Sequence, residues 1–128
     1  MDAQTLLQKI KCDSKMSDCC AGVGDRAFAE RATLENDQFI IANTLRADNT
    51  EIGHWICFYR AQNGRMEMFD SIGEGVQQRS SDACGHHCLM FAYYRCRSLS
   101  FAEILSMYSV CDRCNDGMVV RFVRCVLC

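Results

Sequence analysis

The stretch GHWICFYRAQNGRMEMFD, residues 53–70, decides the fold of this chain. Two mainly apolar runs, residues 54–61 and 65–70, stand on either side of the dipeptide Asn63-Gly64. An Asn-Gly pair between two such runs is a strong signal for a β-hairpin. We therefore predict two antiparallel strands joined at this dipeptide.

The chain before the hairpin supplies a further strand and a helix. The run QFIIANTL, residues 38–45, is β-branched and apolar, which predicts a buried strand. Residues 3–10 are predicted to form a short helix. Residues 13–35 are mixed in character, and Gly22 and Gly24 favour a loop. The N-terminal part, residues 1–35, is thus the part that the sequence describes least.

The chain after the hairpin is predicted to be helical. Residues 84–97 are almost continuously apolar, which is typical of a helix packed centrally against a sheet. Ser100 and Glu103 match a capping box at the start of another helix. Asp116 is predicted to cap a final helix that runs through Val119, Val120, Phe122 and Val123. We expect a single α+β domain over residues 1–128, with a small mixed sheet packed against a central helix.

Four residues in chain order supply the parts of a thiol-dependent active site: His54, Asp70, Gln77 and Cys84. A thiol nucleophile needs a base, a group that orients the base, and donors for the oxyanion that forms on a carbonyl. Cys84 is predicted in the first turn of its helix, where the helix dipole and a nearby His54 imidazolium stabilise a thiolate.

The hairpin allows a geometric test of this site. With a two-residue loop, Asp70 would lie opposite Cys57, on the other face of the sheet from His54. With a three-residue loop, residues 62–64, and a left-handed Gly64 in a bulge, Asp70 lies opposite Ile56 and diagonally beside His54. The active-site hypothesis therefore predicts the three-residue, bulged turn.

Three segments carry a resemblance to a known family. GHWICFYR (53–60), FDSIG (69–73) and VQQRSSDACGHHCLMFAYYRCRS (76–98) resemble the adenovirus-type, or adenain-like, cysteine proteases of viruses and virus-derived mobile elements. The wider clan includes the ubiquitin-like-protein proteases. In this family the order is His, acidic residue, Gln, Cys, which His54, Asp70, Gln77 and Cys84 match. Gln78 is the alternative to Gln77 as the oxyanion donor.

The resemblance implies a function and a fold. It implies a shortened adenain-like fold and an endopeptidase that cleaves viral precursor proteins or similar polypeptides, without a metal or organic cofactor. It also implies a possible peptide or DNA activator, although no particular residue indicates those contacts. Family members usually carry a longer connection between the acidic residue and the Gln than the SIGEGV of residues 71–76.

Composition sets outer limits on compartment and partners. The sequence has no apolar run long enough to cross a membrane and no signal-peptide h-region, so we expect an intracellular, reducing compartment: the host nucleus or cytoplasm, or a virion. The net charge of -2 gives no general nucleic-acid signature. Five arginines make the C-terminal third locally basic, and we interpret them first as solvated helix faces: Arg95, Arg97, Arg113, Arg121 and Arg124.

Eleven cysteines raise two further possibilities. A disulfide framework is not expected in a reducing compartment. Two CxxC pairs, Cys111 with Cys114 and Cys125 with Cys128, have the ligand types of a zinc site, but in a helical context that fits zinc poorly. The alternatives to a viral-type endopeptidase are therefore a zinc-binding interaction module, an inactive protease-like binder, and a protease that removes ubiquitin-like modifiers.

Overall fold

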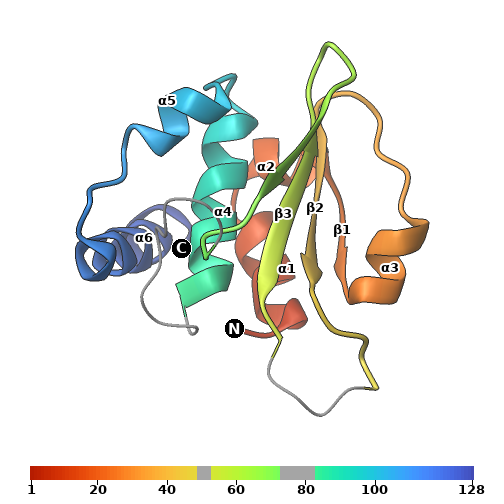
Figure 1. Cartoon of the computed structure of the whole chain (residues 1–128), viewed down its shortest axis with the longest axis horizontal. Coiled ribbons are helices and arrows are strands. Elements are labelled where there is room, and N and C mark those ends of the chain that lie inside the picture. The colour runs from red at the N-terminus through yellow and green to blue at the C-terminus, as the bar shows by residue number, and fades with distance from the viewer. Residues whose placement is uncertain (49–52, 73–82) are drawn as a thin grey trace.

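Four strands form one mixed sheet in the computed structural model, which describes residues 1–48, 53–72 and 83–128 (Figure 1). The strand order is β1-β2-β3-β4. β1 runs parallel to β2, and the β2–β3 and β3–β4 pairs are antiparallel. The bounds are β1 Cys20–Gly24, β2 Gln38–Asn43, β3 Trp55–Arg60 and β4 Met66–Phe69. With its helices, this sheet makes the chain an α+β protein, as predicted.

Helices cover the two faces of the sheet unequally (Figure 1). One face carries α1 (Ala3–Lys11), α2 (Ser14–Cys19) and α4 (Cys84–Arg95), with α5 (Phe101–Leu105) and α6 (Asp112–Val126) beyond α4. The other face carries the short helix α3 (Arg26–Arg31). The predicted central helix is therefore α4, which packs on β3.

The core lies between the sheet and α4. On β3 the buried residues alternate with half-buried ones, so Trp55, Cys57 and Tyr59 face the same side. At the end of β4, the Phe69 ring stacks on the Phe91 ring of α4 with 4.6 Å between centroids. This packing fixes the end of β4 against the helix that carries Cys84.

The hairpin between β3 and β4 has the predicted three-residue turn. Cys57 pairs with Phe69 and Arg60 with Met66. Continuing this register by one residue places Asp70 opposite Ile56. Gly64 has a φ of 84°, in the left-handed region that glycine adopts without strain. The turn thus puts Asp70 on the same face of the sheet as His54.

Two predictions about secondary structure were wrong. Residues 13–35 are not a loop, because they contain α2, β1 and α3. The aspartates Asp13 and Asp25 cap α2 and α3 by accepting backbone N–H groups, and Gly22 and Gly24 lie within β1. Asp116 does not cap the final helix: α6 begins four residues earlier, with the Cys111 side chain as its N-cap acceptor.

Other element predictions were confirmed. α1 and β2 lie within one or two residues of their predicted bounds, and Ser100 and Glu103 form the expected capping box at the start of α5. Cys84 is the first residue of α4. Within the described residues, no helix combines the length and apolar character needed to cross a membrane.

The N- and C-terminal ends of the chain are joined by a disulfide. Cys12, which follows α1, is bonded to Cys128. This bond contradicts the expectation that all thiols stay reduced. The two cysteines lie 116 residues apart in sequence but are adjacent in the fold. The Lys9 ammonium group also donates to the carbonyl oxygens of Leu127 and Cys128, which holds the two ends together.

Candidate active site

His54 stands immediately before β3 and is held by the backbone next to it. Its N–H donates to the Thr44 hydroxyl over 3.1 Å, and its carbonyl accepts the Thr44 N–H over 2.9 Å. Gly53 just before it leaves room for the Asn43 side chain, because a Cβ at residue 53 would lie 1.8 Å from the Asn43 side-chain oxygen and would displace it. These contacts fix the backbone that carries the His54 imidazole, next to the end of β2.

Asp70 lies against the imidazole, as the hairpin register requires. Its Oδ1 is 2.6 Å from His54 Nε2. The same oxygen accepts the Ile72 N–H over 3.0 Å, so Asp70 also begins a turn. The side chains of His54 and Asp70 are 17% and 26% exposed, which shields their interaction partly from water. Asp70 thus fixes the orientation of the His54 ring. Because it binds Nε2, the nitrogen that remains for another partner is Nδ1.

Cys84 reaches the same place from α4. The Trp55 backbone N–H lies 3.5 Å from its sulfur and donates to it. One turn further along α4, the Cys88 thiol donates to the Trp55 carbonyl over 3.4 Å. The beginnings of β3 and α4 meet at one end of the molecule, the lower end in Figure 1. Three segments distant in sequence therefore bring together His54, Asp70 and Cys84.

The imidazole and the thiol interact with each other. Nδ1 of His54 is buried and makes no hydrogen bond of full geometry. Interaction with the Cys84 sulfur is nevertheless the largest influence on the ring, and with Asp70 it raises the pKa of His54 against the opposing effect of burial. A loose thiol–imidazole contact through Nδ1 accounts for both observations, since Asp70 occupies Nε2.

The pKa of the Cys84 thiol shifts in the opposite direction. Burial on its own would raise the pKa of Cys84, but the hydrogen bond and charge of His54, with the Trp55 N–H, lower that pKa below its ordinary value. A lowered thiol pKa beside a raised imidazole pKa favours the thiolate–imidazolium pair. This is the electrostatic arrangement that activates a cysteine nucleophile.

The nucleophile helix packs closely on the N-terminus. A Cβ at Gly85 would lie 3.3 Å from atoms of both Leu6 and Met1, so glycine lets α4 approach α1. The Trp55 indole N–H donates to the Met1 carbonyl over 2.8 Å. Cys84 itself is only 4% exposed, so the glycine permits close packing of the helix and does not open the thiol to solvent.

The predicted oxyanion donors are placed only in part. Gln77 and its alternative Gln78 lie outside the described residues. The backbone N–H of Cys84, the other predicted donor, is at the first position of α4. The first N–H groups of a helix have no partner within the helix, which leaves them available for a developing negative charge.

Sequence reasoning missed a second histidine–carboxylate pair on α4. His87 Nε2 lies 2.9 Å from Asp116 of α6, and Nδ1 lies 3.0 Å from the Tyr108 hydroxyl. His87 is completely buried, and burial lowers its pKa despite the nearby carboxylate. The signal that could have revealed the pair was the placement of Asp116 inside an amphipathic helix rather than at its start.

The two CxxC pairs do not converge on a zinc site. Cys111 and Cys114 lie at the start of α6, whereas Cys125 lies near its end and Cys128 is in the disulfide. Eleven residues of helix separate Cys114 from Cys125 by about 16 Å. Among the described residues, no group of three or more histidines, cysteines or carboxylates is arranged to hold a metal ion.

Two of the five arginines in the C-terminal third are used inside the fold. Arg95 forms a two-point ion pair with Glu67, at 2.8 and 2.9 Å, and lies over the Tyr59 ring. Arg97 forms an ion pair with Asp13 at the start of α2. These two are structural residues rather than solvated helix faces.

No protein-family model, curated protein or solved structure matches this chain.

Proposed function

We propose that this chain is a cysteine-type endopeptidase with Cys84 as nucleophile, His54 as general base and acid, and Asp70 as the group that orients His54. The observation that supports the proposal most strongly is the meeting of Cys84, His54 and Asp70 at one end of the sheet. The opposite pKa shifts of the thiol and the imidazole support the same roles.

The reaction is acyl transfer. The Cys84 thiolate attacks the peptide carbonyl carbon, and the carbonyl π electrons move to oxygen. The His54 imidazolium then protonates the leaving amine, which gives a thioester on Cys84. His54 next takes a proton from water as the water attacks the thioester, and the acid product leaves with the thiol restored. Asp70 keeps the ring oriented throughout.

The oxyanion is stabilised by N–H donors. We assign one donor to the Cys84 backbone N–H, at the start of α4, and a second to the side-chain amide of Gln77. Losing one donor of this kind typically costs about 10²- to 10³-fold in rate. The Trp55 N–H acts before the attack, because its contact is with the Cys84 sulfur.

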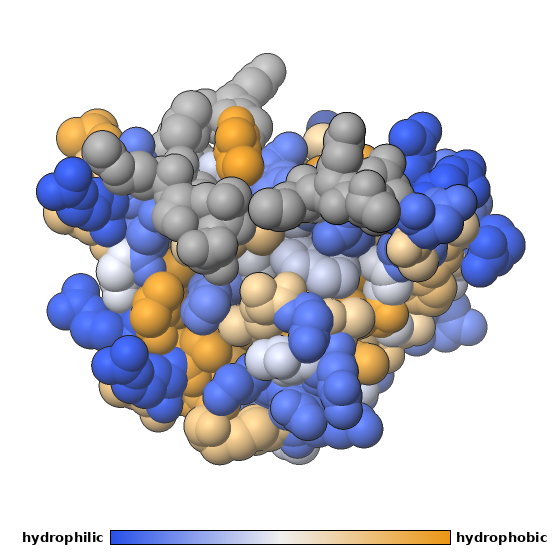
Figure 2. Space-filling view, turned by 90° about the horizontal axis from the view of Figure 1, so that it is seen from below, coloured by the Kyte–Doolittle hydropathy of each residue, from blue (hydrophilic) through white to orange (hydrophobic). Residues whose placement is uncertain are grey.

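We propose a polypeptide as substrate. A hollow of about 370 Å³ lies at the start of β3 and is lined in part by Gly53 and Trp55, the sequence neighbours of His54, but not by His54, Asp70 or Cys84. Figure 2 shows this end of the molecule from below, with hydrophobic patches among hydrophilic residues on its described part. A polypeptide segment offers both polar backbone and apolar side chains to such a surface.

The resemblance to adenain-like proteases favours viral precursor proteins as the substrate class, acted on in a reducing compartment that keeps Cys84 as a thiol. Removal of a ubiquitin-like modifier is the alternative within the same clan. Both use the same attack on a carbonyl, so one set of active-site variants tests them together. A peptide or DNA activator remains a further proposal from the resemblance alone.

Limited alkylation of the thiols tests the assembled site. The purified chain is treated with a limiting, mildly reactive alkylator near neutral pH, and each cysteine is followed by peptide mapping. We expect Cys84 to be labelled quickly in the wild type and at least about tenfold more slowly in His54→Ala, because the imidazolium no longer stabilises the thiolate. Alkylation also tests access to a sulfur that is largely buried.

Cys111 supplies an internal control in every sample. It is fully exposed, and hydrogen bonding with Cys114 lowers its pKa, so fast labelling alone does not identify an active site. Labelling of Cys111 should be unchanged by His54→Ala. If Cys84 is labelled equally slowly with and without His54, the proposed peptidase is wrong. If activated Cys84 accompanies binding of peptides without turnover, the protein is a protease-like binder.

A further inference from the structure

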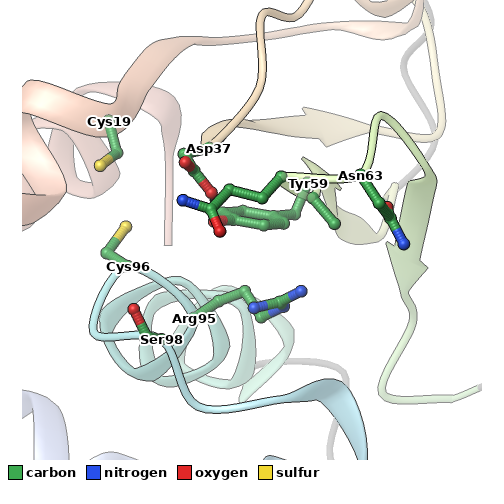
Figure 3. Close-up of a pocket in the computed structure, with 9 residues that line it drawn as sticks. Cys19, Asp37, Tyr59, Asn63, Arg95, Cys96 and Ser98 are labelled. Carbon is green, nitrogen blue, oxygen red and sulfur yellow. The ribbon is translucent and has the colours of Figure 1, made fainter.

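A second hollow lies at the opposite end of β3 and α4 from the candidate active site. Its volume is about 540 Å³. Figure 3 shows polar and sulfur-bearing side chains around it, contributed by α2, the β3–β4 hairpin and the end of α4. The twelve residues of α4 separate the two sites by about 18 Å along the helix. This hollow plays no part in the proposed peptidase mechanism.

Two free thiols face each other at the hollow. Cys19 is the last residue of α2, and Cys96 follows α4 as its C-cap. Their sulfur atoms point toward one another in Figure 3, and the two side chains are in hydrogen-bonding contact. Both residues are half-buried, and neither is in a disulfide. A thiol–disulfide exchange site needs two neighbouring thiols and open space for the disulfide substrate, and both are present here.

The two cysteines differ in the chemistry available to them. Burial, together with the Cys19 sulfur, raises the pKa of Cys96. Cys96 therefore keeps its proton and donates it toward the Cys19 sulfur. A thiol that keeps its proton is the poorer attacking group. Cys19 is therefore the attacking thiol, and Cys96 is the thiol that acts second.

An ion pair holds the two thiols in place. Arg97, next to Cys96, binds the Asp13 carboxylate over 2.5 Å, and Asp13 is the N-cap of α2. The Arg97 guanidinium also lies 3.5 Å from the centroid of the Tyr93 ring. The end of α4 is thereby fixed to α2 beside both cysteines, so little rearrangement is needed to join their sulfurs.

The backbone around the hollow is unusual. Asp37 and Ser98, which both line it, have φ values of 65° and 69°, in the left-handed region that residues other than glycine seldom adopt. Residues held in such conformations cluster at functional sites. The Asp37 N–H donates to the Arg60 carbonyl over 2.7 Å, which holds this conformation in place.

The charge of the hollow favours a cation. The Arg95 guanidinium at its wall is paired with Glu67 on two oxygens. The Asp37 carboxylate accepts the Tyr59 hydroxyl over 2.9 Å but has no ion-pair partner within the described part of the chain. The Arg95 guanidinium interacts with both Glu67 and Asp37, so two carboxylates share one guanidinium and the net charge beside the hollow is negative.

We propose that Cys19 and Cys96 form a thiol–disulfide exchange site that takes a small cationic disulfide from this hollow. The Cys19 thiolate attacks one sulfur of the disulfide R–S–S–R, its S–S bond breaks, and one R–S⁻ leaves and takes up a proton. Cys96 then loses its proton to solvent and attacks the mixed disulfide at Cys19, which releases the second R–S⁻. The protein dithiol is oxidised by two electrons, and the small disulfide is reduced to two thiols.

The test uses cystamine, a small disulfide with two ammonium groups, and peptide mapping without reductant. Because Cys20 neighbours Cys19 and is also a free, half-buried thiol, each experiment is repeated in Cys20→Ser to assign the linkage. We expect the wild type and Cys20→Ser to form a Cys19–Cys96 disulfide. Cys96→Ser should accumulate a stable mixed disulfide on Cys19, whereas Cys19→Ser should carry none on Cys96.

A charge comparison tests the choice of ligand. Dithiodiglycolate, an anionic disulfide of similar size, should react more slowly than cystamine. At about 6 Å in a wet site, attraction of an ammonium group and repulsion of a carboxylate each change the rate about threefold, so the ratio of the two rates should include a factor of about ten from Asp37. Asp37→Asn should lower this rate ratio by about tenfold, and what remains reflects the different leaving thiols; Asn tolerates the left-handed backbone that Asp37 adopts. Asp18→Asn is the matched control, on α2 outside the hollow, and should preserve the ratio.

Two results would overturn the proposal. One is a wild-type chain in which cystamine modifies the exposed thiols while Cys19 and Cys96 both stay free. The other is a Cys96→Ser variant that is folded by circular dichroism but gains no adduct on Cys19. A ratio of cystamine to dithiodiglycolate rates that is the same in the wild type and in Asp37→Asn would refute the assigned ligand class.

Discussion

Replacing Asp70 by Asn tests whether the carboxylate activates the thiol through His54. Asn keeps the size of the side chain and an oxygen that accepts the Ile72 N–H, so the turn is preserved. It removes the negative charge 2.6 Å from His54 Nε2. That charge helps to raise the pKa of His54, so the variant should hold less imidazolium and therefore less Cys84 thiolate.

The expected size of the effect follows from the contact. A hydrogen bond to a charged group contributes about 1.5–3 kcal/mol, and each 1.4 kcal/mol corresponds to a factor of ten. The two side chains are mostly shielded from water, which keeps the interaction within this range. We therefore expect Asp70→Asn to slow the alkylation of Cys84 by about 10- to 100-fold at neutral pH.

The assay is the alkylation rate of each cysteine as a function of pH. In the wild type, Cys84 labelling should rise through a pKa below the ordinary thiol value of 9.0, and in Asp70→Asn the rise should move to higher pH. Asp116→Asn is the matched control, because it changes the other histidine–carboxylate pair. A Cys84 profile that is the same in wild type and Asp70→Asn would refute the reasoning.

Three further predictions concern the fold. Gly64→Ala should lower the free energy of unfolding by about 1–2 kcal/mol in urea titrations, because the left-handed backbone penalises a Cβ whose nearest neighbour, the Arg60 guanidinium at 3.8 Å, is an ordinary contact; Gly64→Asn should cost less. Phe91→Ala should cost about 3–5 kcal/mol in the same titrations, because it removes a completely buried ring stacked on Phe69; a loss below 1 kcal/mol would contradict the packing. Burial lowers the pKa of His87 in the folded state, so below the ordinary value of 6.5 the unfolded chain binds a proton that the folded chain does not. The free energy of unfolding should therefore fall on acidification by up to about 1.4 kcal/mol per pH unit, and His87→Gln, measured between pH 7 and 5, should lack this component.

The hairpin was predictable because its signals are local. Asn63-Gly64 marks the turn, and the alternation on either side limits the register to a few choices. Requiring His54 and Asp70 on one face selected the three-residue loop, which the pairing of Cys57 with Phe69 confirms. The start of α4 at Cys84 was equally accessible, since an apolar run begins there.

β1 was missed because its stability comes from a distant partner. Its five residues include Gly22 and Gly24, which weaken a strand on their own. The strand is stabilised by parallel pairing with β2, which no local sequence pattern indicates. The helices on either side did carry local signals, because Asp13 and Asp25 are both N-caps.

The cysteines show a different limit. Sequence spacing alone suggested that the two CxxC pairs could bind one zinc ion. In the structure, Cys111 and Cys125 lie at the two ends of a single helix. The actual partner of Cys128 is Cys12, which becomes a neighbour only when α1 and the C-terminus meet. Likewise, Cys19 and Cys96 meet because α2 packs beside the end of α4. Sequence separation carries no information about such pairings.

The two histidine–carboxylate pairs show why a motif alone does not define an acid–base site. His54 and His87 both bind an aspartate within 3 Å, yet the pKa of His54 is raised and that of His87 is lowered. His87 is completely buried and its Nδ1 faces the hydroxyl of Tyr108, so the cost of burying a charge prevails. His54 retains some exposure, and its second nitrogen is left for a thiol that can become negative. The presence of Cys84, more than the carboxylate, therefore distinguishes a base able to activate a nucleophile from a histidine that only fastens α4 to α6.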